Sequence, residues 1–503
     1  MKIKITKHPF RRDRYVIPFL LLLFSFQSVV ALEMVVVGDP GNSRDNNHMK
    51  SDLGNNNATE EKPGSVDYAF RISVHEVTNS EYAEFLNAKA KTDLAYYRHD
   101  NAEKYESGFY DDATIDDLPV NLYALEMGSS PHGGIERSGS RGEFVYTVKP
   151  GFEDKPVNFV NKFDAQRYCN WLTNGKGDGD TETGVYINTG DLEDNSDENA
   201  FYTSSLTSYD KGRSHRNAEA WAKGGYALPN ADEWAKAAFY DPEKGENGGY
   251  WEYPTRSATA PTAEQGNFDL SGYGTVVDVG QYPSNGAYGI YDLAGNVEEW
   301  IEDNGEETAN DVTMTWDDPF YPVLFRDTAR NFAPGGSFQD PVSDTYYKQG
   351  VPKILLIEDS NRGFRVVQGM KAIERWRHGH FDDDYETTEI SGHEADPDTD
   401  GMNNLLEYAQ NLDPNDGSDV HAGLKVETSA GATALRFRKN KDAPDVNFQI
   451  QQTDDLSAPN WQAAELGAQT IVNEAGNTLE LSAPTTGSAT SERFYRVRVE
   501  VKE

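Results

Sequence analysis

The chain has 503 residues, of which 37% are hydrophobic and 12% are aromatic, and its formal net charge is −38 at pH 7. This length and this apolar content predict two or three folded domains and exclude disorder throughout the chain. The negative charge disfavours nucleic acid and anionic lipid as partners, because their phosphate groups would be repelled, and it favours divalent cations.

The first 31 residues have the pattern of an export signal. Basic residues between Lys2 and Arg14 precede an apolar run over residues 16–26, and small residues at positions 29–31 offer a cleavage site. The apolar run is short for a membrane span. We therefore expect residues 1–31 to be removed and the protein to be secreted, periplasmic or at the cell surface, without a transmembrane segment. An uncleaved N-terminal anchor is the alternative.

Three helices are expected in the first half of the chain. Thr78 and Glu81 have the spacing of a capping box, as do Asn230 and Glu233, so a helix is expected to begin at each pair. Residues 164–172 place their large apolar side chains on one helical face. Long stretches rich in Gly, Asn and Asp separate these segments. The pattern predicts an α+β domain with much irregular structure.

The sequence changes character near residue 371. Residues 372–381 favour a short helix, and alternating apolar and polar residues from Leu424 onward favour β-strands. We therefore expect an acidic calcium-binding linker over residues 371–418 and a small all-β, β-sandwich-like domain over residues 419–503.

The linker is expected to bind calcium because residues 396–407 match the loop pattern D-x-D-x-D-G-x5-E. Asp396, Asp398 and Asp400 would be side-chain ligands, Gly401 would form the sharp turn, Met402 would offer its carbonyl oxygen, and Glu407 would be the bidentate last ligand. A single loop of this kind resembles a dockerin or thrombospondin-type calcium repeat more than a sensor EF-hand. Its expected role is to rigidify the connection between domains.

Two other polar stretches are weaker metal candidates. The acidic stretch over residues 174–199, which includes 178–182 (DGDTE), could bind calcium, and His378 and His380 beside residues 382–384 could hold a transition metal. We interpret both as solvated polar segments.

Six motifs occur in a fixed order between residues 76 and 365. They are residues 76–82 (EVTNSEY), 156–158 (PVN) with 168–172 (YCNWL), 228–234 (LPNADEW), 292–300 (DLAGNVEEW), 335–337 (GGS) and 363–365 (GFR). Together they resemble the formylglycine-generating-enzyme (sulfatase-modifying factor) family over residues 32–370. The resemblance implies a variant of the C-type-lectin architecture with little regular secondary structure.

The resemblance also implies copper-dependent oxidation of a sulfatase cysteine, and this sequence lacks the ligands for it. The family binds copper through two thiolates, which as soft ligands suit Cu(I). Asp340 and Thr345 stand at the positions of those cysteines, and Cys169 is the only thiol in the chain. Copper is therefore not expected as a cofactor. Ala227 also departs from the family pattern, which commonly has arginine there.

The family's calcium sites fit the sequence better. The resemblance implies that Asp292 and Glu299 bind calcium through their side chains, and Gly295 and Val297 through backbone oxygens. A second site maps onto Asn267, with the carbonyl oxygen of Phe268 as a further candidate. Two carboxylates around a Gly-Asn turn independently favour calcium, because it prefers hard oxygen ligands. The alternative is a helix entry, with Glu298 and Glu299 near the helix dipole.

These observations favour a secreted family member that has lost copper oxidation and binds a protein or glycan ligand with calcium as a stabilising cofactor. The rival interpretation is an oxidoreductase with altered chemistry acting on a protein or small thiol. In that case Ser337 and Asp340 would line a pocket, and Asp340 would act as an acid or base or bind a harder metal such as iron.

A third interpretation places the function in the β domain, which would anchor the chain to a cell surface or polysaccharide. Trp461 and Phe494 are candidates for that contact, although aromatic residues in strands belong more often to the core.

Overall fold

The computed structural model describes residues 32–44, 63–91, 122–186, 216–268, 272–283, 286–302, 333–342, 358–418, 423–429, 432–486 and 493–502. Contacts along the chain group residues 33–503 into one unit. The expected export signal over residues 1–31 and Thr345 lie outside the described residues. No helix in the described part of the chain combines the length and the apolarity that crossing a bilayer requires.

A four-stranded antiparallel sheet joins the beginning and the end of the region up to residue 370. Its strands, in spatial order, are β1 (Met34–Val37), β2 (Phe70–Ser73), β10 (Val367–Gly369) and β5 (Tyr226–Ala227). Ile72 pairs with Val35 on one side and with Val367 on the other. Phe70, Ile72 and Val367 are fully buried, so the two central strands are held by apolar contacts.

Three helices lie in the same region: α1 (Asn79–Lys89), α4 (Lys162–Thr173) and α6 (Ala231–Phe239). Both predicted capping boxes are present, since Thr78 and Asn230 accept the backbone N–H of the residue three places later. Glu81 and Glu233 accept the cap residues' backbone N–H in return. These local signals therefore set where α1 and α6 begin.

Aromatic side chains fill the space between α1 and α4. Tyr82 stacks on Tyr168 with ring centroids 5.9 Å apart, and Phe85 lies edge-on to Tyr168 at 5.5 Å. Trp171 is 5.2 Å from Phe85 and fully buried. Cys169, on the same helix, is also fully buried, and burial raises the pKa of its thiol well above the ordinary value. Cys169 is therefore part of the core.

Short elements complete this region: α3 (Glu126–Ser129), β3 (Ile135–Ser138), β4 (Val145–Val148), α5 (Ala218–Ala222), β6 (Tyr240–Asp241), β7 (Gly249–Tyr250), β8 (Glu298–Glu299) and β9 (Arg362–Gly363). β8 pairs with β9 in parallel, Glu298 opposite Arg362. The helix entry considered at Glu298 and Glu299 is wrong, because this pairing with a distant segment holds both residues in a strand.

Four short helices follow: α7 (Ala372–Phe381), the 3-10 helix η5 (Asp382–Glu386), α8 (Thr388–Ser391) and α9 (Asn404–Gln410). The predicted helix over residues 372–381 is confirmed as α7. Leu405, Tyr408 and Ala409 of α9 pack with Ile373 of α7 and with Val446 in one apolar cluster. α9 thus joins the linker to the strands that follow it.

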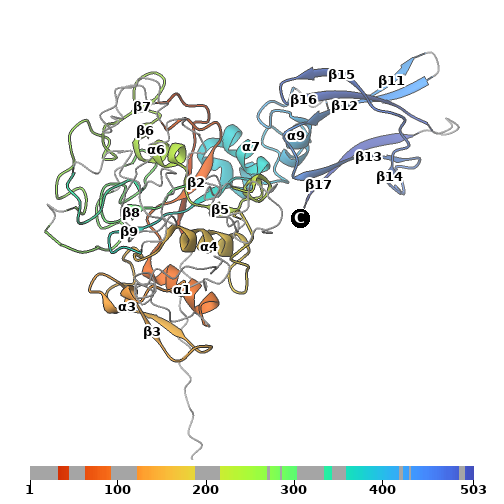
Figure 1. Ribbon diagram of the computed structural model, residues 1–503. Helices are drawn as coiled ribbons and strands as arrows, with labels where there is room; N and C mark the ends of the chain where they lie inside the picture. Colours follow the sequence, from red (N-terminus) through yellow and green to blue (C-terminus); the bar gives the residue numbers. More distant parts are fainter. Residues whose placement is uncertain are drawn as a thin grey trace, which may run out of the picture. The chain divides into compact units, whose positions relative to one another are not determined.

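The C-terminal strands form two antiparallel sheets (Figure 1). The four-stranded sheet has the order β11 (Leu424–Ser429), β12 (Ala432–Asn440), β16 (Thr478–Pro484), β15 (Thr470–Ala475), and the three-stranded sheet has the order β14 (Gln462–Ala463), β13 (Val446–Thr453), β17 (Phe494–Val501). Leu435, Phe437 and Leu481 of the first sheet share a core with Ile450 of the second. Strands and a core between two sheets are therefore present, as the alternating pattern predicts.

Candidate functional site

Three aspartates of the linker bring carboxylate oxygens together. Asp396, Asp398 and Asp400 each offer one oxygen, and these oxygens lie within 4.8 Å of one another. Asp396 Oδ1, Asp398 Oδ2 and Asp400 Oδ2 are buried and have no hydrogen-bond partner among the described residues. Buried acceptors of this kind are costly unless a donor or a cation satisfies them. The cluster therefore fits a hard divalent cation.

The second oxygen of each aspartate shapes the loop. Asp398 Oδ1 accepts the backbone N–H of Asp400 at 3.1 Å, Asp396 Oδ2 that of Gly401 at 3.1 Å, and Asp400 Oδ1 that of Met402 at 2.7 Å. Gly401 has a φ of +95°, which favours glycine. Burial, together with the charges of Asp400 and Asp396, raises the pKa of Asp398 above its ordinary value. The fold thus holds three mutually repelling carboxylates in place.

Glu407, the predicted last ligand, lies in α9 and is fully buried. Asn403 caps this helix, with its side-chain oxygen accepting the N–H of Leu406 at 3.1 Å. The predicted loop therefore leads directly into the helix that joins α7 to the C-terminal strands. Neither His378 nor residues 178–182 belong to a cluster of three potential metal ligands among the described residues.

The carboxylate of Glu299 is held by a buried ion pair. Its Oε1 accepts Arg365 Nη2 at 2.6 Å, and its Oε2 accepts Arg365 Nε and Trp234 Nε1, each at 2.7 Å. The side chains of Glu299 and Arg365 are 0% exposed. Asp292 Oδ2 accepts the backbone N–H of Gly280 at 2.6 Å, and burial raises the pKa of Asp292 to about 6. These contacts account for Glu299 without an ion, and calcium at Asp292 and Glu299 stays a prediction.

The other residues predicted for the family's calcium sites lie side by side. Asn267 forms a parallel bridge with Gly295, whose φ is +93°. A Cβ at Gly295 would lie 2.1 Å from the carbonyl oxygen of Asn267, so only glycine permits this approach. Val297 is fully buried against Val276 and Phe338. Asn267 and Gly295 are thus brought together by the fold, whereas their binding of an ion is untested.

Glu76 is a buried acid whose position the sequence did not single out. It is 0% exposed, and neither carboxylate oxygen has a hydrogen-bond partner among the described residues. Burial, and next the charge of Asp292, raises the pKa of Glu76 well above its ordinary value. Its place in the first family motif was the only signal, and that motif alone does not reveal burial beside a second acid.

Asp340, predicted to stand at the position of the family's first copper-binding cysteine, is part of a closed turn. The hydroxyl of Ser337, which is fully buried, donates to Asp340 Oδ2, and the backbone N–H of Asp340 donates to Ser337 O at 3.0 Å. Ser337 Oγ also accepts the backbone N–H of Gln339 at 3.2 Å. Asp340 therefore stabilises a packed turn, and its hard carboxylate does not fit Cu(I).

Arg216 supplies a contact that the sequence did not predict. Its guanidinium donates to Glu302 Oε1 at 2.9 Å and to the carbonyl oxygen of Leu228 at 2.5 Å, and it also binds Glu233. This places an arginine beside the 228–234 motif although Ala227 occupies the family's usual arginine position. Burial raises the pKa of Glu302 to about 7. Arg216 thus forms ion pairs with two buried carboxylates, those of Glu233 and Glu302.

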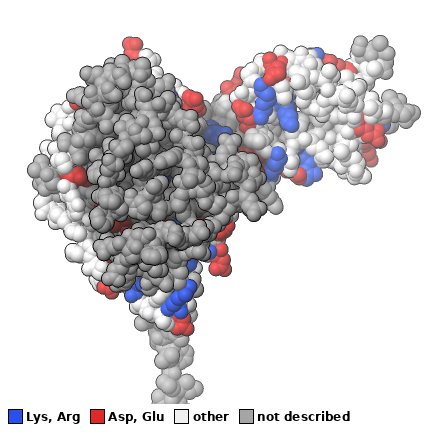
Figure 2. Space-filling view, in the orientation of Figure 1, with Lys and Arg blue, Asp and Glu red and all other residues white. Residues whose placement is uncertain are grey.

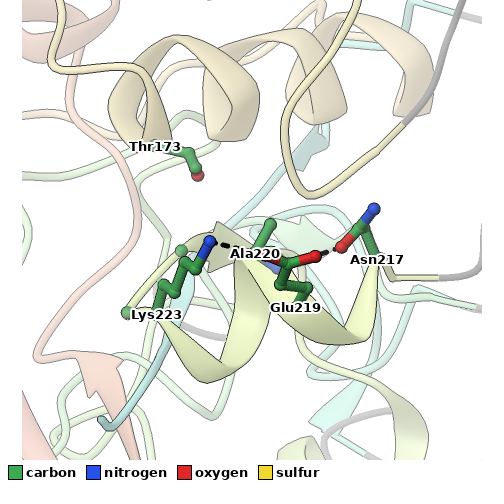
Figure 3. A pocket seen from close by; sticks show the side chains of 7 residues that line it. Thr173, Asn217, Glu219, Ala220 and Lys223 are labelled. Atoms are coloured by element: carbon green, nitrogen blue, oxygen red, sulfur yellow. Dashed lines mark hydrogen bonds and ion pairs between the residues drawn. The ribbon is translucent and has the colours of Figure 1, made fainter. Parts of the chain in front are cut away.

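A surface pocket lies between the end of α4 and the short helix α5 (Figure 3). It is lined by Thr173, Asn217, Glu219, Ala220, Lys223, Gly224 and Gly225. Lys223 Nζ pairs with Glu219 Oε1 at 2.6 Å, and both side chains are largely exposed. None of the predicted site residues lines this pocket. An exposed pair of this kind contributes little stability and indicates no chemistry.

The chain is similar to one known protein family and to solved structures. The family model of the sulfatase-modifying factor enzyme 1-like domain matches residues 28–370. The chain is 17% identical to variable protein 1 of Treponema denticola, with a TM-score of 0.30 over 66% of this chain and 94% of that chain. It is 16% identical to PvdO from Pseudomonas aeruginosa, with a TM-score of 0.34; the match covers 67% of this chain and 94% of PvdO. Comparison with curated protein sequences gives no match.

Proposed function

We propose, since this chain belongs to the family of the sulfatase-modifying factor enzyme 1-like domain, that it is a calcium-stabilised member that binds a protein or glycan ligand without copper-dependent oxidation. The observation that carries this proposal is the turn formed by Ser337 and Asp340. A carboxylate stands where the oxidases of the family have a thiolate, and it is bonded to a buried hydroxyl. The scaffold is thus kept, while the soft ligand that Cu(I) requires is replaced.

Calcium is the proposed cofactor of the linker. The support is the convergence of buried oxygens from Asp396, Asp398 and Asp400, which Ca²⁺ would satisfy with the hard ligands it prefers. Met402 and Glu407 are the proposed backbone and bidentate ligands. Bound calcium would offset the mutual repulsion of the three aspartates and fix the start of α9.

The finer organisation of the chain is part of the same proposal. Residues 419–503 would be a separate β-sandwich-like domain, residues 371–418 its calcium-binding linker, and residues 32–370 a variant of the C-type-lectin architecture. Export by residues 1–31 would bring the protein to the periplasm, the cell surface or the medium, where calcium is abundant. The proposal of a β-sandwich-like domain over residues 419–503 is supported by the two C-terminal sheets, which share a core.

The loss of oxidation is tested with a peptide that carries the sulfatase motif. The purified full chain is incubated with this peptide, copper and oxygen, and the peptide mass is followed. We expect no aldehyde. Loss of mass at the peptide cysteine would overturn the proposal. Supplying iron in place of copper tests the rival oxidoreductase, which would react with iron and not with copper.

The calcium part has its own test. Isothermal titration of the metal-free protein with calcium should give at least one binding event, and Asp398→Ala should remove the event that belongs to the 396–407 loop. The matched control is Asp178→Asn, an exposed acid in the other acidic loop, which should leave the titration unchanged. A titration that is flat for the natural sequence would refute calcium stabilisation.

A further inference from the structure

The three-stranded C-terminal sheet has one face in the core and one face toward solvent. Ile450 of β13 and Val497 of β17 pack into the core shared with the four-stranded sheet. Because side chains alternate along a strand, Gln451 and its partner Arg496 lie on the opposite face. Gln449 and Arg498, the next pair on that face, are exposed.

Trp461, Arg496 and Gln451 form a fixed group on this outer face. The guanidinium of Arg496 lies 4.3 Å from the centroid of the Trp461 ring. Its Nε and Nη2 donate to Gln451 Oε1 at 3.0 and 2.8 Å. Gln451 is only 4% exposed although it lies on the outer face, while Arg496 is exposed and Trp461 half-buried. The arginine and the indole ring therefore cover the glutamine.

Fixing Arg496 in this way prepares it for a ligand. A free surface arginine loses side-chain entropy when it binds, at a cost of about 0.5–1.5 kcal/mol for a rotamer-rich side chain. Here the contacts to Gln451 and Trp461 already restrict the side chain. A guanidinium carries five N–H donors in one plane, and the two bonds to Gln451 leave others for an anionic group.

The charge of this face differs from that of the chain. The net charge of the whole protein is −38, whereas the outer face of β17 presents Arg496 and Arg498, the latter paired with Glu500. Figure 2 shows both basic and acidic side chains among uncharged surface in the region that Figure 1 labels β11 to β17, so this region is less uniformly acidic than the net charge of the chain suggests. The guanidinium of Arg496 beside the indole ring of Trp461, together with the exposed amide of Gln449, complements a ligand with both anionic and hydroxyl groups.

We propose that the outer face of the β14–β13–β17 sheet binds an acidic polysaccharide, with Trp461 against a sugar ring, Arg496 on a carboxylate and Gln449 on hydroxyl groups. This rests on the proposed binding role and names its ligand class. Nucleic acid would also stack on Trp461, but its dense phosphate charge is repelled more strongly by a chain of charge −38. A polysaccharide with one uronate per two sugars carries less charge along its length. Its repulsion by the acidic chain is therefore weaker, and the attraction of its carboxylates to the guanidinium of Arg496 can outweigh it.

The test is calorimetric titration of the full chain, at fixed calcium and salt, with hyaluronate as the uronate polysaccharide, dextran as the neutral one and poly-dT as the nucleic acid. We expect hyaluronate to bind and dextran and poly-dT to bind at least about tenfold more weakly. Trp461→Ala and Arg496→Gln should each weaken hyaluronate binding by about tenfold, the equivalent of one lost stacking contact or charge-assisted hydrogen bond. The affinity of Arg496→Lys for hyaluronate should lie between that of Arg496→Gln and that of the natural sequence, because lysine keeps the charge and loses the planar arrangement of donors.

Arg438→Gln is the matched control, since Arg438 lies in β12 of the other sheet. It removes the same charge as Arg496→Gln. Because salt screens attraction between distant charges, hyaluronate affinity should stay within about twofold of that of the natural sequence. Thermal unfolding followed by circular dichroism establishes that each variant is folded, and Trp461→Phe replaces Trp461→Ala if the latter does not fold.

Three results would overturn the inference: no hyaluronate binding, equal weakening by Arg438→Gln and Arg496→Gln, or tighter binding of poly-dT than of hyaluronate. The calcium titration and the peptide assay do not involve this sheet. A protein that takes up calcium and forms no aldehyde but does not bind hyaluronate would therefore refute the polysaccharide inference and leave the rest of the proposed function standing.

Discussion

The guanidinium of Arg216 holds both carboxylate oxygens of Glu233, with Nη1 2.7 Å from Oε1 and Nη2 2.5 Å from Oε2. Glu233 is fully buried and also closes the capping box of α6. A single bidentate pair thus connects the third residue of α6 to a segment 17 positions earlier, and it compensates a charge that would otherwise be isolated in the core.

Removing this arginine should destabilise the protein strongly. Arg216→Ala leaves Glu233 and Glu302 buried without their cation, and the free energy of unfolding should fall by roughly 3–5 kcal/mol, as for other broken buried pairs. Urea unfolding followed by fluorescence measures the change. Lys223→Ala breaks the exposed pair with Glu219 and should cost less than about 1 kcal/mol. Similar losses for the two variants would contradict the buried role of Arg216.

Glu302 should make stability depend on pH. Burial raises its folded-state pKa from 4.5 to about 7, so the folded protein holds this proton more tightly than the unfolded chain. The contribution of Glu302 is therefore most favourable below pH 4.5 and is lost as pH rises toward 7. Its size is on the order of 3 kcal/mol, from about 1.4 kcal/mol for each pKa unit.

The variant Glu302→Gln isolates this effect, because glutamine has no proton to lose. Between pH 4.5 and 7 the stability of the natural protein, relative to that of the variant, should decline as pH rises. Urea unfolding of both proteins at several pH values gives the difference. Parallel curves for the two proteins would show that Glu302 titrates normally.

Calcium should raise the unfolding temperature through the 396–400 loop. At a free calcium concentration about 100-fold above the dissociation constant, the stabilisation should be about 2.7 kcal/mol if the unfolded chain does not bind the ion. Addition of a chelator should reverse the shift, and Asp398→Ala should abolish it. A melting temperature that is indifferent to chelator, in a protein of natural sequence, would contradict the prediction.

Two cysteines should restore Cu(I) binding if Asp340 marks the family's metal position. The double variant Asp340→Cys with Thr345→Cys should compete with a chromogenic Cu(I) chelator, since two thiolates suit this ion. Asp340→Cys alone should compete more weakly, and the natural sequence should not compete. Equal competition by the natural sequence would show that the chain binds Cu(I) through other groups.

Local signals predicted much of the fold. Thr78 with Glu81, and Asn230 with Glu233, identified the starts of α1 and α6, because a capping box needs only residues three positions apart. The motif order predicted the family, which the match over residues 28–370 confirms. The structure also brings together the three aspartates named from the local loop pattern, Asp396, Asp398 and Asp400, while their binding of calcium stays a prediction.

Features that depend on distant pairing were missed. Glu298 and Glu299 form a strand because Arg362 and Gly363 lie beside them, and nothing within a few residues of Glu298 announces that partner. The burial of Glu76 and its proximity to Asp292 likewise arise from tertiary packing. Side-chain charge alone would have placed such acids at the surface.

The position of α9 has a mechanical consequence. Tyr408 of α9 donates a hydrogen bond to Asp445, which also accepts the backbone N–H of Ile373 of α7 at 3.0 Å, so two helices of the linker are tied to the start of β13. A pull on the C-terminal strands would load α9, whose first turn follows the aspartate loop directly. Calcium bound at the loop would then raise the force needed to separate the C-terminal strands from the rest of the chain. A single-molecule stretching experiment would record this effect as a calcium-dependent unfolding force.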